Sequence, residues 1–487
     1  MKLNLNGNIN RIYVQSLCLM FYHGVKFPVN EESDDDLELT LDVCELVEGI
    51  LCRALLRDGD REESAEDFCA FSCDESKDRT YKIAIGRAIF EAGNRLTGKE
   101  IGWGILTGIR PSKVAADIIA DSSFDEAKRI LEEKYLLSEE KSDLCCTVAK
   151  HETDILNMTD DSKCSLYISI PFCPSRCTYC SFISYAGKKL FSLIPDYLDK
   201  LCSDIVNTAE IIKKNGLTLS SIYIGGGTPT VLSAEQLEKL LLTVYSSVDV
   251  GSLCEYTLEG GRPDTITDEK LAIAKKYGIT RISVNPQTLN DAVLERIGRK
   301  HTVEDFFEAY KRVKASGIKH INTDLIAGLE GDTYSSFKAT VDKIIELDPD
   351  NVTVHSFCVK NAAQIRSDNK DIYKDTDDTA TRCVDYSVKA LTDSGYIPYY
   401  MYRQKNTVNN LENVGYAKEN TFGLYNVFMM SDAHTVFGVG AGSTTKLVKN
   451  VNGETDILRI FSPKYPYEYL QETKEIKDTV KDFFERS

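Results

Sequence analysis

A regular alternation of apolar and amphipathic segments between Ser165 and Leu347 constrains the fold of this chain more than any other feature. The apolar segments are typical of buried strands, and the amphipathic segments between them are typical of helices. The expected strands span residues 166–170, 221–224, 256–259, 281–285, 321–326 and 352–357, and the expected helices span 195–214, 234–248, 268–277, 303–315 and 334–346. Such an alternation predicts a parallel sheet covered by helices. Six strands are too few to close an eight-stranded barrel, so we expect an α/β fold with an open, partial (β/α)6 TIM-like barrel.

The segments on either side of this alternation predict two further domains. Residues 1–157 are expected to form an N-terminal α+β accessory domain, residues 158–360 the partial barrel, and residues 361–487 a mostly helical, substrate-covering C-terminal domain. Within the first of these, the expected elements are a strand at 8–14 and helices at 37–56 and 81–96.

A glycine-punctuated stretch from Gly102 to Lys113 contains Trp103, the only tryptophan of the chain. We interpret it as a turn that leads into a helix from Val114. The alternative is a docking element whose Arg110 and Lys113 face the active site.

Three cysteines follow the first expected strand at the spacing C-x3-C-x2-C: Cys173, Cys177 and Cys180. In a parallel sheet this loop lies at the carboxyl end of the strand, where chemistry is usually located. Three thiolates can hold a [4Fe-4S] cluster, which normally takes four, and leave one iron open to another ligand. The alternatives are a structural zinc site completed by Cys164 or His151, and three unrelated buried cysteines.

Glycine and polar residues mark the carboxyl ends of the later strands. The second strand runs into Gly225, Gly226, Gly227 and Thr228, where three glycines let the backbone approach a ligand closely. This stretch lacks the Lys-Ser/Thr pair of a nucleotide P-loop. The polar side chains at or beyond the later strand ends are Glu259, Gln287, Asp324 and His355. A purely structural sheet has no reason to end so many strands in polar groups, so we expect these residues to line one site.

Composition excludes several classes of function. The net charge of −17 over 487 residues argues against nucleic acid as the main partner, because phosphate binding needs a basic surface. The chain shows no signal segment and no 18-residue apolar run that could span a membrane, and its fifteen cysteines suit a reducing compartment. We therefore expect a cytoplasmic protein.

Taken in order, these motifs resemble the radical S-adenosylmethionine superfamily. The resemblance rests on the stretch from Tyr167 to Phe182, on residues 225–230, and on Glu259, Gln287, Arg299 and Asp324. Within the superfamily, residues 165–357 are similar to the oxygen-independent coproporphyrinogen III oxidase family. The long N-terminal segment and the segments 402–406 and 413–416 resemble its coproporphyrinogen dehydrogenase branch, called HemZ.

The resemblance implies a role for each matching residue. Cys173, Cys177 and Cys180 would hold a [4Fe-4S] cluster whose fourth iron takes the amino and carboxylate groups of S-adenosylmethionine. Tyr179 would shield the cluster, and Tyr167 would lie near the sulfonium. The residues implied to contact the methionyl and ribose groups are Gly226, Gly227, Thr228, Glu259, Gln287, Arg299 and Asp324. Arg299 can form a bidentate pair with a carboxylate, and Asp324 can accept hydrogen bonds from ribose hydroxyls.

The resemblance also implies a reaction, which is the decarboxylation of coproporphyrinogen III to protoporphyrinogen IX by a 5′-deoxyadenosyl radical. It implies a tetrapyrrole substrate and an electron donor of the flavodoxin or ferredoxin type. A tetracarboxylate on so acidic a protein requires local cations. The candidates are Arg403 and Lys405, and less directly Arg366 and Arg110, although each could equally be a surface charge.

The sequence departs from the oxidase pattern in ways that leave the substrate open. Phe182 stands where the oxidases carry a fourth cysteine, and the oxidases' aromatic C-terminal motif is replaced by residues 400–406. One alternative is therefore a haem chaperone of the same family, with His355 or His434 as an axial ligand. Another alternative is a radical enzyme that acts on a different tetrapyrrole.

Overall fold

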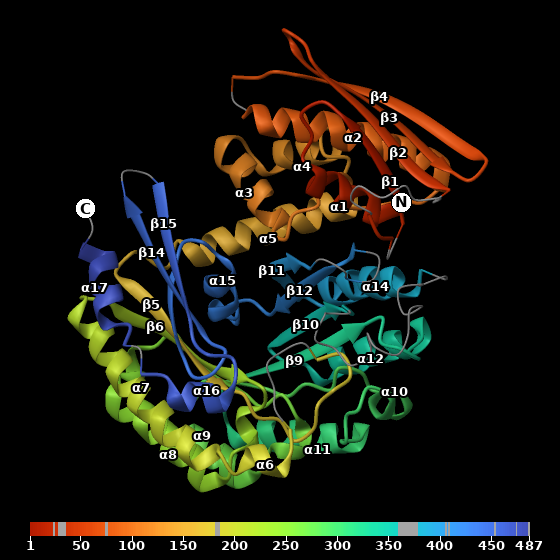
Figure 1. Ribbon diagram of the computed structural model, residues 1–487. Helices are drawn as coiled ribbons and strands as arrows, with labels where there is room; N and C mark the ends of the chain where they lie inside the picture. The colour runs from red at the N-terminus through yellow and green to blue at the C-terminus, as the bar shows by residue number, and fades with distance from the viewer. Residues whose placement is uncertain are drawn as a thin grey trace. The chain divides into compact units, whose positions relative to one another are not determined.

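The computed structural model describes residues 1–22, 25–27, 36–73, 76–180, 186–358, 378–404, 407, 410–451, 454–473 and 475–485 (Figure 1). The chain divides into two compact units. The first is built mainly from Met1–Lys150 and includes Met401–Glu412, and the second contains the remaining parts of the chain from His151 onward. No helix among the described residues is long and apolar enough to cross a membrane.

The first unit is an α+β structure. Its four-stranded sheet has the order β1-β2-β3-β4, with β1 parallel to β2 and the other pairs antiparallel. The strands are β1 (Lys2–Asn6), β2 (Leu37–Glu45), β3 (Gly49–Asp58) and β4 (Arg61–Ala70). The helices are α1 (Arg11–Phe21), α2 (Lys77–Thr97), α3 (Pro111–Asp121), α4 (Phe124–Glu133) and α5 (Glu139–Leu156), which continues past Lys150. Helix α2 matches the helix expected at 81–96, and the turn before Pro111 agrees with our interpretation of the Trp103 stretch.

Two predictions for this unit are wrong. The strand expected at 8–14 is replaced by α1, because the Asn10 side chain accepts a hydrogen bond from the Tyr13 amide and caps a helix there. The helix expected at 37–56 is instead β2 and β3. In β2 the buried Leu39 and Leu41 are two residues apart, which is the period of a strand with one covered face.

The second unit contains the predicted parallel strands, which pair in chain order from β5 to β10. These strands are β5 (Lys163–Ile170), β6 (Thr218–Gly226), β7 (Glu255–Glu259), β8 (Arg281–Ser283), β9 (His320–Ala327) and β10 (Asn351–Ser356). The helices that follow them are α6 (Lys188–Phe191), α7 (Ile194–Lys214), α8 (Ala234–Ser247), α9 (Asp268–Lys276), α10 (Asp291–Arg296), α11 (Val303–Ser316) and α12 (Tyr334–Leu347). Figure 1 shows these helices along the outer side of the sheet.

The expectation of a mostly helical C-terminal domain is wrong. Among the described residues after Asp378, five strands extend the sheet at both edges to the order β11-β12-β10-β9-β8-β7-β6-β5-β13-β14-β15. The added elements are α14 (Thr379–Asp393), β11 (Ile397–Arg403), β12 (Glu412–Ala417), α15 (Leu424–Met430), β13 (Thr435–Val439), β14 (Thr444–Val451), β15 (Glu454–Phe461), α16 (Pro466–Gln471) and α17 (Lys477–Glu485). Strand β13 is parallel to β5, whereas β12, β14 and β15 are antiparallel to their neighbours. Both edges of the six-strand sheet are thereby paired, which removes two exposed rows of backbone hydrogen-bonding groups. The chain is thus a mixed α/β protein with a large, mostly parallel sheet.

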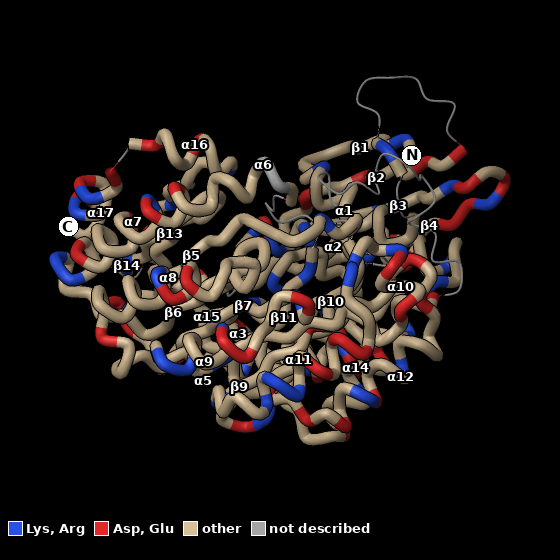
Figure 2. The backbone as a smooth tube through the Cα atoms, turned by 90° about the horizontal axis from the view of Figure 1, so that it is seen from below, with Lys and Arg blue, Asp and Glu red and all other residues tan. Residues whose placement is uncertain are grey.

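Charged residues of both signs are distributed along the whole described part of the chain. Figure 2 shows Asp and Glu on many separate elements, with Lys and Arg interspersed and no continuous basic stripe in that view. The distribution agrees with the excess of acidic residues in the sequence.

Candidate active site at the carboxyl ends of the parallel strands

The cysteine loop leaves the carboxyl end of β5 and is fixed on two sides by backbone hydrogen bonds. The Gly227 and Thr228 amides donate to the carbonyls of Ile170 and Phe172, both at 2.8 Å. On the other side, the Thr178 amide donates to the Ile297 carbonyl at 3.0 Å. The loop is therefore held between the end of β6 and the segment after α10.

The triple glycine is required by close approach of two backbones. Gly226 has φ of +113°, and a Cβ on Gly227 would lie 2.6 Å from the Phe172 carbonyl oxygen. The same approach brings Thr228 Oγ1 to 3.2 Å from Cys173 Sγ. Predicted residues from two strand ends thus meet in one place.

The three cysteines lie together on this loop. Cys173 and Cys177 are buried, Cys180 is partly exposed, and the Cys180 amide donates to the Cys177 carbonyl at 3.1 Å. The pKa of Cys173 is raised to about 11, chiefly by burial; the hydrogen bond to Thr228 lowers it, and the neighbouring Cys180 and Cys177 raise it. Cys177 and Cys180 are near enough to Cys173 to raise its pKa, and an iron–sulfur cluster bound there would hold all three as thiolates. The donor set fits such a cluster, because each cysteine would bind a different iron.

A zinc site built with Cys164 or His151 is absent from the described residues. No group of three or more His, Cys, Asp or Glu side chains there lies close enough to hold one metal ion. Cys164 is fully buried near the amino end of β5, about 20 Å along the strand from Ile170, the residue at which the strand ends before the cysteine loop, at about 3.3 Å per residue. His151 lies against the Phe422 ring instead, at 5.4 Å between centroids.

Glu259, at the end of β7, lies beside the glycine turn. A Cβ on Gly225 would be 2.8 Å from Glu259 Oε2. The pKa of Glu259 is raised to about 8, chiefly by burial and then by the charge of Asp324, although hydrogen bonds from the Gly226 amide and Tyr223 lower it. A carboxyl group in this state is strongly biased towards a cationic partner.

Gln287 and Asp324 are fixed next to each other. Gln287 has φ of +70°, and its amide donates to the Asp324 carbonyl at 3.1 Å. Asn285 holds the Asp324 side chain through Nδ2, at 2.8 Å from Oδ2. Gln287 Oε1 is buried without a hydrogen-bond partner among the described residues, so it is available to a ligand. His355 Nε2 lies 3.9 Å from Asp324 Oδ2.

Arg299 is buried between the cysteine loop and the ends of the strands. Its Nη1 donates to the Asn285 carbonyl at 2.6 Å and more weakly to Gly261 at 3.3 Å, while Nε has no partner among the described residues. Burial acts to lower the pKa of Arg299, but Tyr179 and Cys177 act against it and the pKa is raised overall. Arg299 and Tyr179 are therefore both adjacent to the cysteines.

Three residues that were not predicted from the sequence complete the site: Tyr223, Tyr425 and Arg262. Tyr167 stacks with Tyr223 of β6 and Tyr425 of α15, with ring centroids 6.2 and 6.0 Å away. Tyr223 is two residues before the first glycine of the turn, so strand alternation could have placed it on the Tyr167 face. Tyr425 carries no comparable signal. The third residue is Arg262, whose Nη1 lies 3.8 Å from Cys177 Sγ.

Several candidates lie elsewhere or outside the described residues. Arg403 is buried in the first unit, where it donates to the Leu106 and Asn410 carbonyls and covers the Trp103 ring. These contacts account for its guanidinium without a substrate. His434 is buried with both ring nitrogens hydrogen-bonded, to Thr159 and Ser165, which argues against axial ligation. The candidates outside the described residues are Phe182, Arg366 and Lys405.

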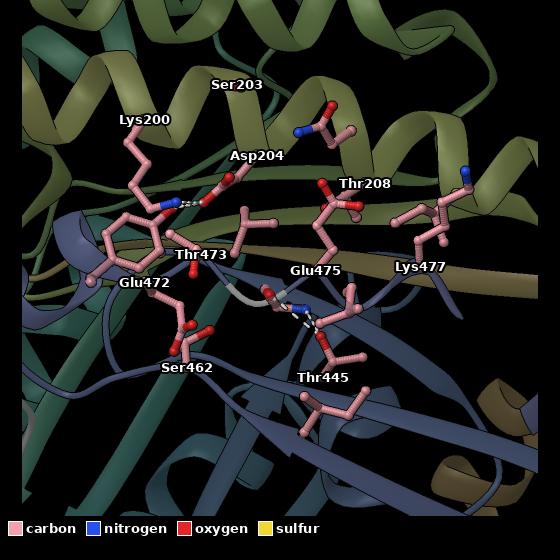
Figure 3. A pocket seen from close by; sticks show the side chains of 18 of the residues that line it. Lys200, Ser203, Asp204, Thr208, Thr445, Ser462, Glu472, Thr473, Glu475 and Lys477 are labelled. Carbon is pink, nitrogen blue, oxygen red and sulfur yellow. Dashed lines mark hydrogen bonds and ion pairs between the residues drawn. The ribbon is translucent and has the colours of Figure 1, made fainter. Parts of the chain in front are cut away.

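A separate pocket of 460 Å³ lies between α7 and the C-terminal strands and helices (Figure 3). Lys200 already pairs with Asp204 at 3.5 Å, as Figure 3 shows. Its ammonium also lies over the Tyr469 ring. None of the predicted site residues lines this pocket.

Comparison with known proteins adds independent information. Residues 167–344 match the radical SAM superfamily. Over 473 residues the chain is 32% identical to the oxygen-independent coproporphyrinogen-III oxidase-like protein HemZ of Bacillus subtilis (strain 168), covering 96% of this chain and 93% of that protein. It is 38% identical to the heme chaperone HemW of the same organism over 197 residues, which is 40% of this chain and 51% of HemW. The structure of coproporphyrinogen III oxidase (HemN) from Escherichia coli superposes with a TM-score of 0.50 at 22% identity, over 68% of this chain and 73% of that one, and so shares the fold.

Proposed function

We propose that this chain, which belongs to the radical SAM superfamily and within it to the HemN/HemZ-like coproporphyrinogen oxidase family, decarboxylates coproporphyrinogen III to protoporphyrinogen IX without oxygen. The observation that carries the proposal is similarity to HemZ along almost the whole chain, including the predicted site. Family membership implies a [4Fe-4S] cluster and S-adenosylmethionine as cofactors. The parallel order of β5 to β10 would place both at the carboxyl ends of the strands.

We assign the cluster to Cys173, Cys177 and Cys180. When bound, the cluster delivers the electron that cleaves S-adenosylmethionine and so generates the radical that takes a hydrogen atom from substrate. Phe172, which is fully buried, and Tyr179 would limit the access of water to the cysteines.

The polar residues around the loop are assigned to S-adenosylmethionine. The raised pKa of Glu259 suits an acceptor for the methionyl ammonium, with the Gly226–Thr228 backbone beside it. The unpartnered Nε of Arg299 suits a carboxylate, and the unpartnered Oε1 of Gln287 suits an N–H or O–H donor. Asp324 would accept from the ribose, and Tyr167 would cover the sulfonium with its ring.

The substrate side of the proposal has fewer residues. The C-terminal segment from residue 361 would cover a tetrapyrrole. Arg403 is accounted for within the first unit, which leaves Lys405, Arg366 and Arg110 as the sequence candidates for a propionate partner. An electron donor of the flavodoxin or ferredoxin type would reduce the cluster. One turnover per propionate, and thus two per substrate, is expected.

An anaerobic assay tests this proposal. The full chain is reconstituted with iron and sulfide, then mixed with dithionite, S-adenosylmethionine and coproporphyrinogen III, and the products are read by mass spectrometry. The proposal expects 5′-deoxyadenosine and a tetrapyrrole that has lost two carboxyl groups. Cleavage of S-adenosylmethionine with coproporphyrinogen untouched would refute the substrate assignment.

The same assay separates the alternatives. A product with a methylated or opened ring would point to a different tetrapyrrole reaction. Tight haem binding with no turnover would favour a chaperone function like the one HemW is named for, which the partial HemW match motivates.

A further inference from the structure

A buried arginine outside the proposed cofactor contacts reaches the cysteine loop. Arg262 follows the end of β7 in the order Glu259-Gly-Gly-Arg-Pro-Asp264, and only 3% of it is exposed. Its Nη1 donates to Ser175 Oγ at 3.1 Å and lies 3.8 Å from Cys177 Sγ. The guanidinium therefore touches both a predicted cluster ligand and the turn that presents it.

Both the side chain and the backbone of Arg262 are held in this position. Asp264 pairs with it at two points, Oδ1 at 3.1 Å from Nε and Oδ2 at 3.5 Å from Nη2. The Arg262 carbonyl accepts a hydrogen bond from Thr265 Oγ1 at 2.7 Å. Ser175 in turn donates to the Gly298 carbonyl at 3.2 Å, which ties the same turn to the segment before Arg299.

We propose that Arg262 is a positioning residue that sets the reduction potential of the cluster through Cys177, with Asp264 as its counter-charge. This inference rests on the proposed function, because it needs a cluster at Cys173, Cys177 and Cys180. It goes beyond that function because it gives a role to Arg262 and Asp264, neither of which is assigned to a cofactor above.

The physical argument concerns charge at the cluster. Reduction adds one negative charge to a group already held by three thiolates. A buried guanidinium against one ligand sulfur stabilises the reduced state more than the oxidised state, and therefore moves the potential to a less negative value. The effect is strong because the surroundings are buried and weakly screened. Asp264, whose side chain is 30% exposed, offsets part of this charge and so acts in the opposite direction.

Arg299 is the other cation beside Cys177, and its proposed use differs. Its pKa is affected by Cys177 and Tyr179, and its free Nε is assigned to the carboxylate of S-adenosylmethionine. The described hydrogen bonds of the Arg262 guanidinium go to Asp264, Ser175 and Cys177. The two arginines can therefore be distinguished by experiments without S-adenosylmethionine.

The test is a reductive titration of the reconstituted full chain without S-adenosylmethionine, monitored by electron paramagnetic resonance. The expected result is a midpoint potential more negative than wild type for R262Q and less negative for D264N, with R262K between R262Q and wild type. The control is R312Q, which removes an arginine of the same unit that pairs with Glu308 at 3.0 Å on the surface. It should leave the potential unchanged. Iron content and thermal midpoint are recorded for each variant.

The outcomes distinguish this role from others. Unchanged potentials in R262Q and D264N with full iron content would show that Arg262 only braces the loop and would overturn the inference. Shifts of the same sign in both variants would also overturn it, since the charges act in opposite directions. If R262Q does not fold, D264N alone decides. Absence of any cluster in the wild-type protein would overturn the proposed function itself, and this inference with it.

Discussion

Replacing Glu259 with Gln should stabilise the protein in the absence of cofactors, and this gain should grow as the pH rises. The carboxyl group is buried near Asp324, and its charge raises the pKa values of the nearby Tyr167 and Tyr223. Its pKa in the folded protein is about 8, against 4.5 ordinarily. Between these two values the folded state keeps a proton that the unfolded state has lost. Folding therefore becomes less favourable as the pH rises from 4.5 through 8 and then levels off.

The size of this effect follows from the pKa difference. A rise from 4.5 to about 8 corresponds to an upper limit of about 5 kcal/mol at high pH, at about 1.4 kcal/mol per factor of ten. Between pH 6 and pH 9 the change is about 2 to 3 kcal/mol. Glutamine has nearly the same shape and no such titration, so E259Q should avoid this loss. For a unit of this size, the difference amounts to a few degrees in thermal midpoint.

The assay compares thermal midpoints of wild type and E259Q at pH 6 and pH 9 by calorimetry. The matched control is E308Q, an exposed glutamate of the same unit with 59% of its side chain accessible, which should show no pH-dependent gain. Infrared difference spectra of wild type minus E259Q should show a protonated carboxyl band at pH 6 that is lost above pH 8. A pH-independent difference in midpoint, or no protonated band at pH 6, would refute the reasoning. E259Q should also bind S-adenosylmethionine weakly, because it lacks the carboxylate for the ammonium.

Three further variants test other parts of the structure. G227A places a Cβ 2.6 Å from a backbone oxygen, so it should lower the iron content and reduce the free energy of unfolding by about 1 to 3 kcal/mol. The control G251A, whose added Cβ would have its nearest neighbour at 3.3 Å, should be nearly neutral. Equal iron content in both variants would contradict the close packing. K141M leaves the fully buried Glu412 carboxylate without its cationic partner and should lower the free energy of unfolding, measured by urea denaturation, by about 3 to 5 kcal/mol. The double variant K141M/E412Q should recover most of that free energy. H434A should leave any haem Soret band unchanged, because both ring nitrogens already have partners; loss of the band would revive axial ligation.

The parallel strands were predictable because each is a short apolar run bounded by helix signals. Ser233 and Gln236 form the capping box that starts α8, and Gly317 adopts the left-handed conformation that ends α11. Strands buried on both faces read as apolar throughout, so the sequence pattern and the final environment agree.

The C-terminal strands were not predictable in the same way. Strand β13 pairs with β5, so Phe437 lies opposite Leu166, and no local pattern encodes a partner so distant in sequence. The prediction of a helix from Leu37 was wrong for a different reason, because leucines at alternate positions also satisfy part of a helical spacing.

The residues of the candidate site also divide into those that local sequence features predict and those that long-range contacts bring in. Strand ends are local features, so Glu259, Gln287 and Asp324 could be named and are now seen side by side. Tyr425 reaches the site only because Glu255 accepts hydrogen bonds from the first amides of α15, which is a contact between distant segments. Arg262 carried a weak signal, as a charged residue three positions beyond a strand end.

The most direct test of the central claim is the electron paramagnetic resonance spectrum of the reduced, reconstituted protein before and after addition of S-adenosylmethionine. We predict a [4Fe-4S] signal whose shape changes on addition, and no such cluster in variants with Cys173, Cys177 or Cys180 replaced by Ala. A protein that binds no cluster, or a cluster signal that S-adenosylmethionine does not alter, would contradict the assignment of an open iron at this loop.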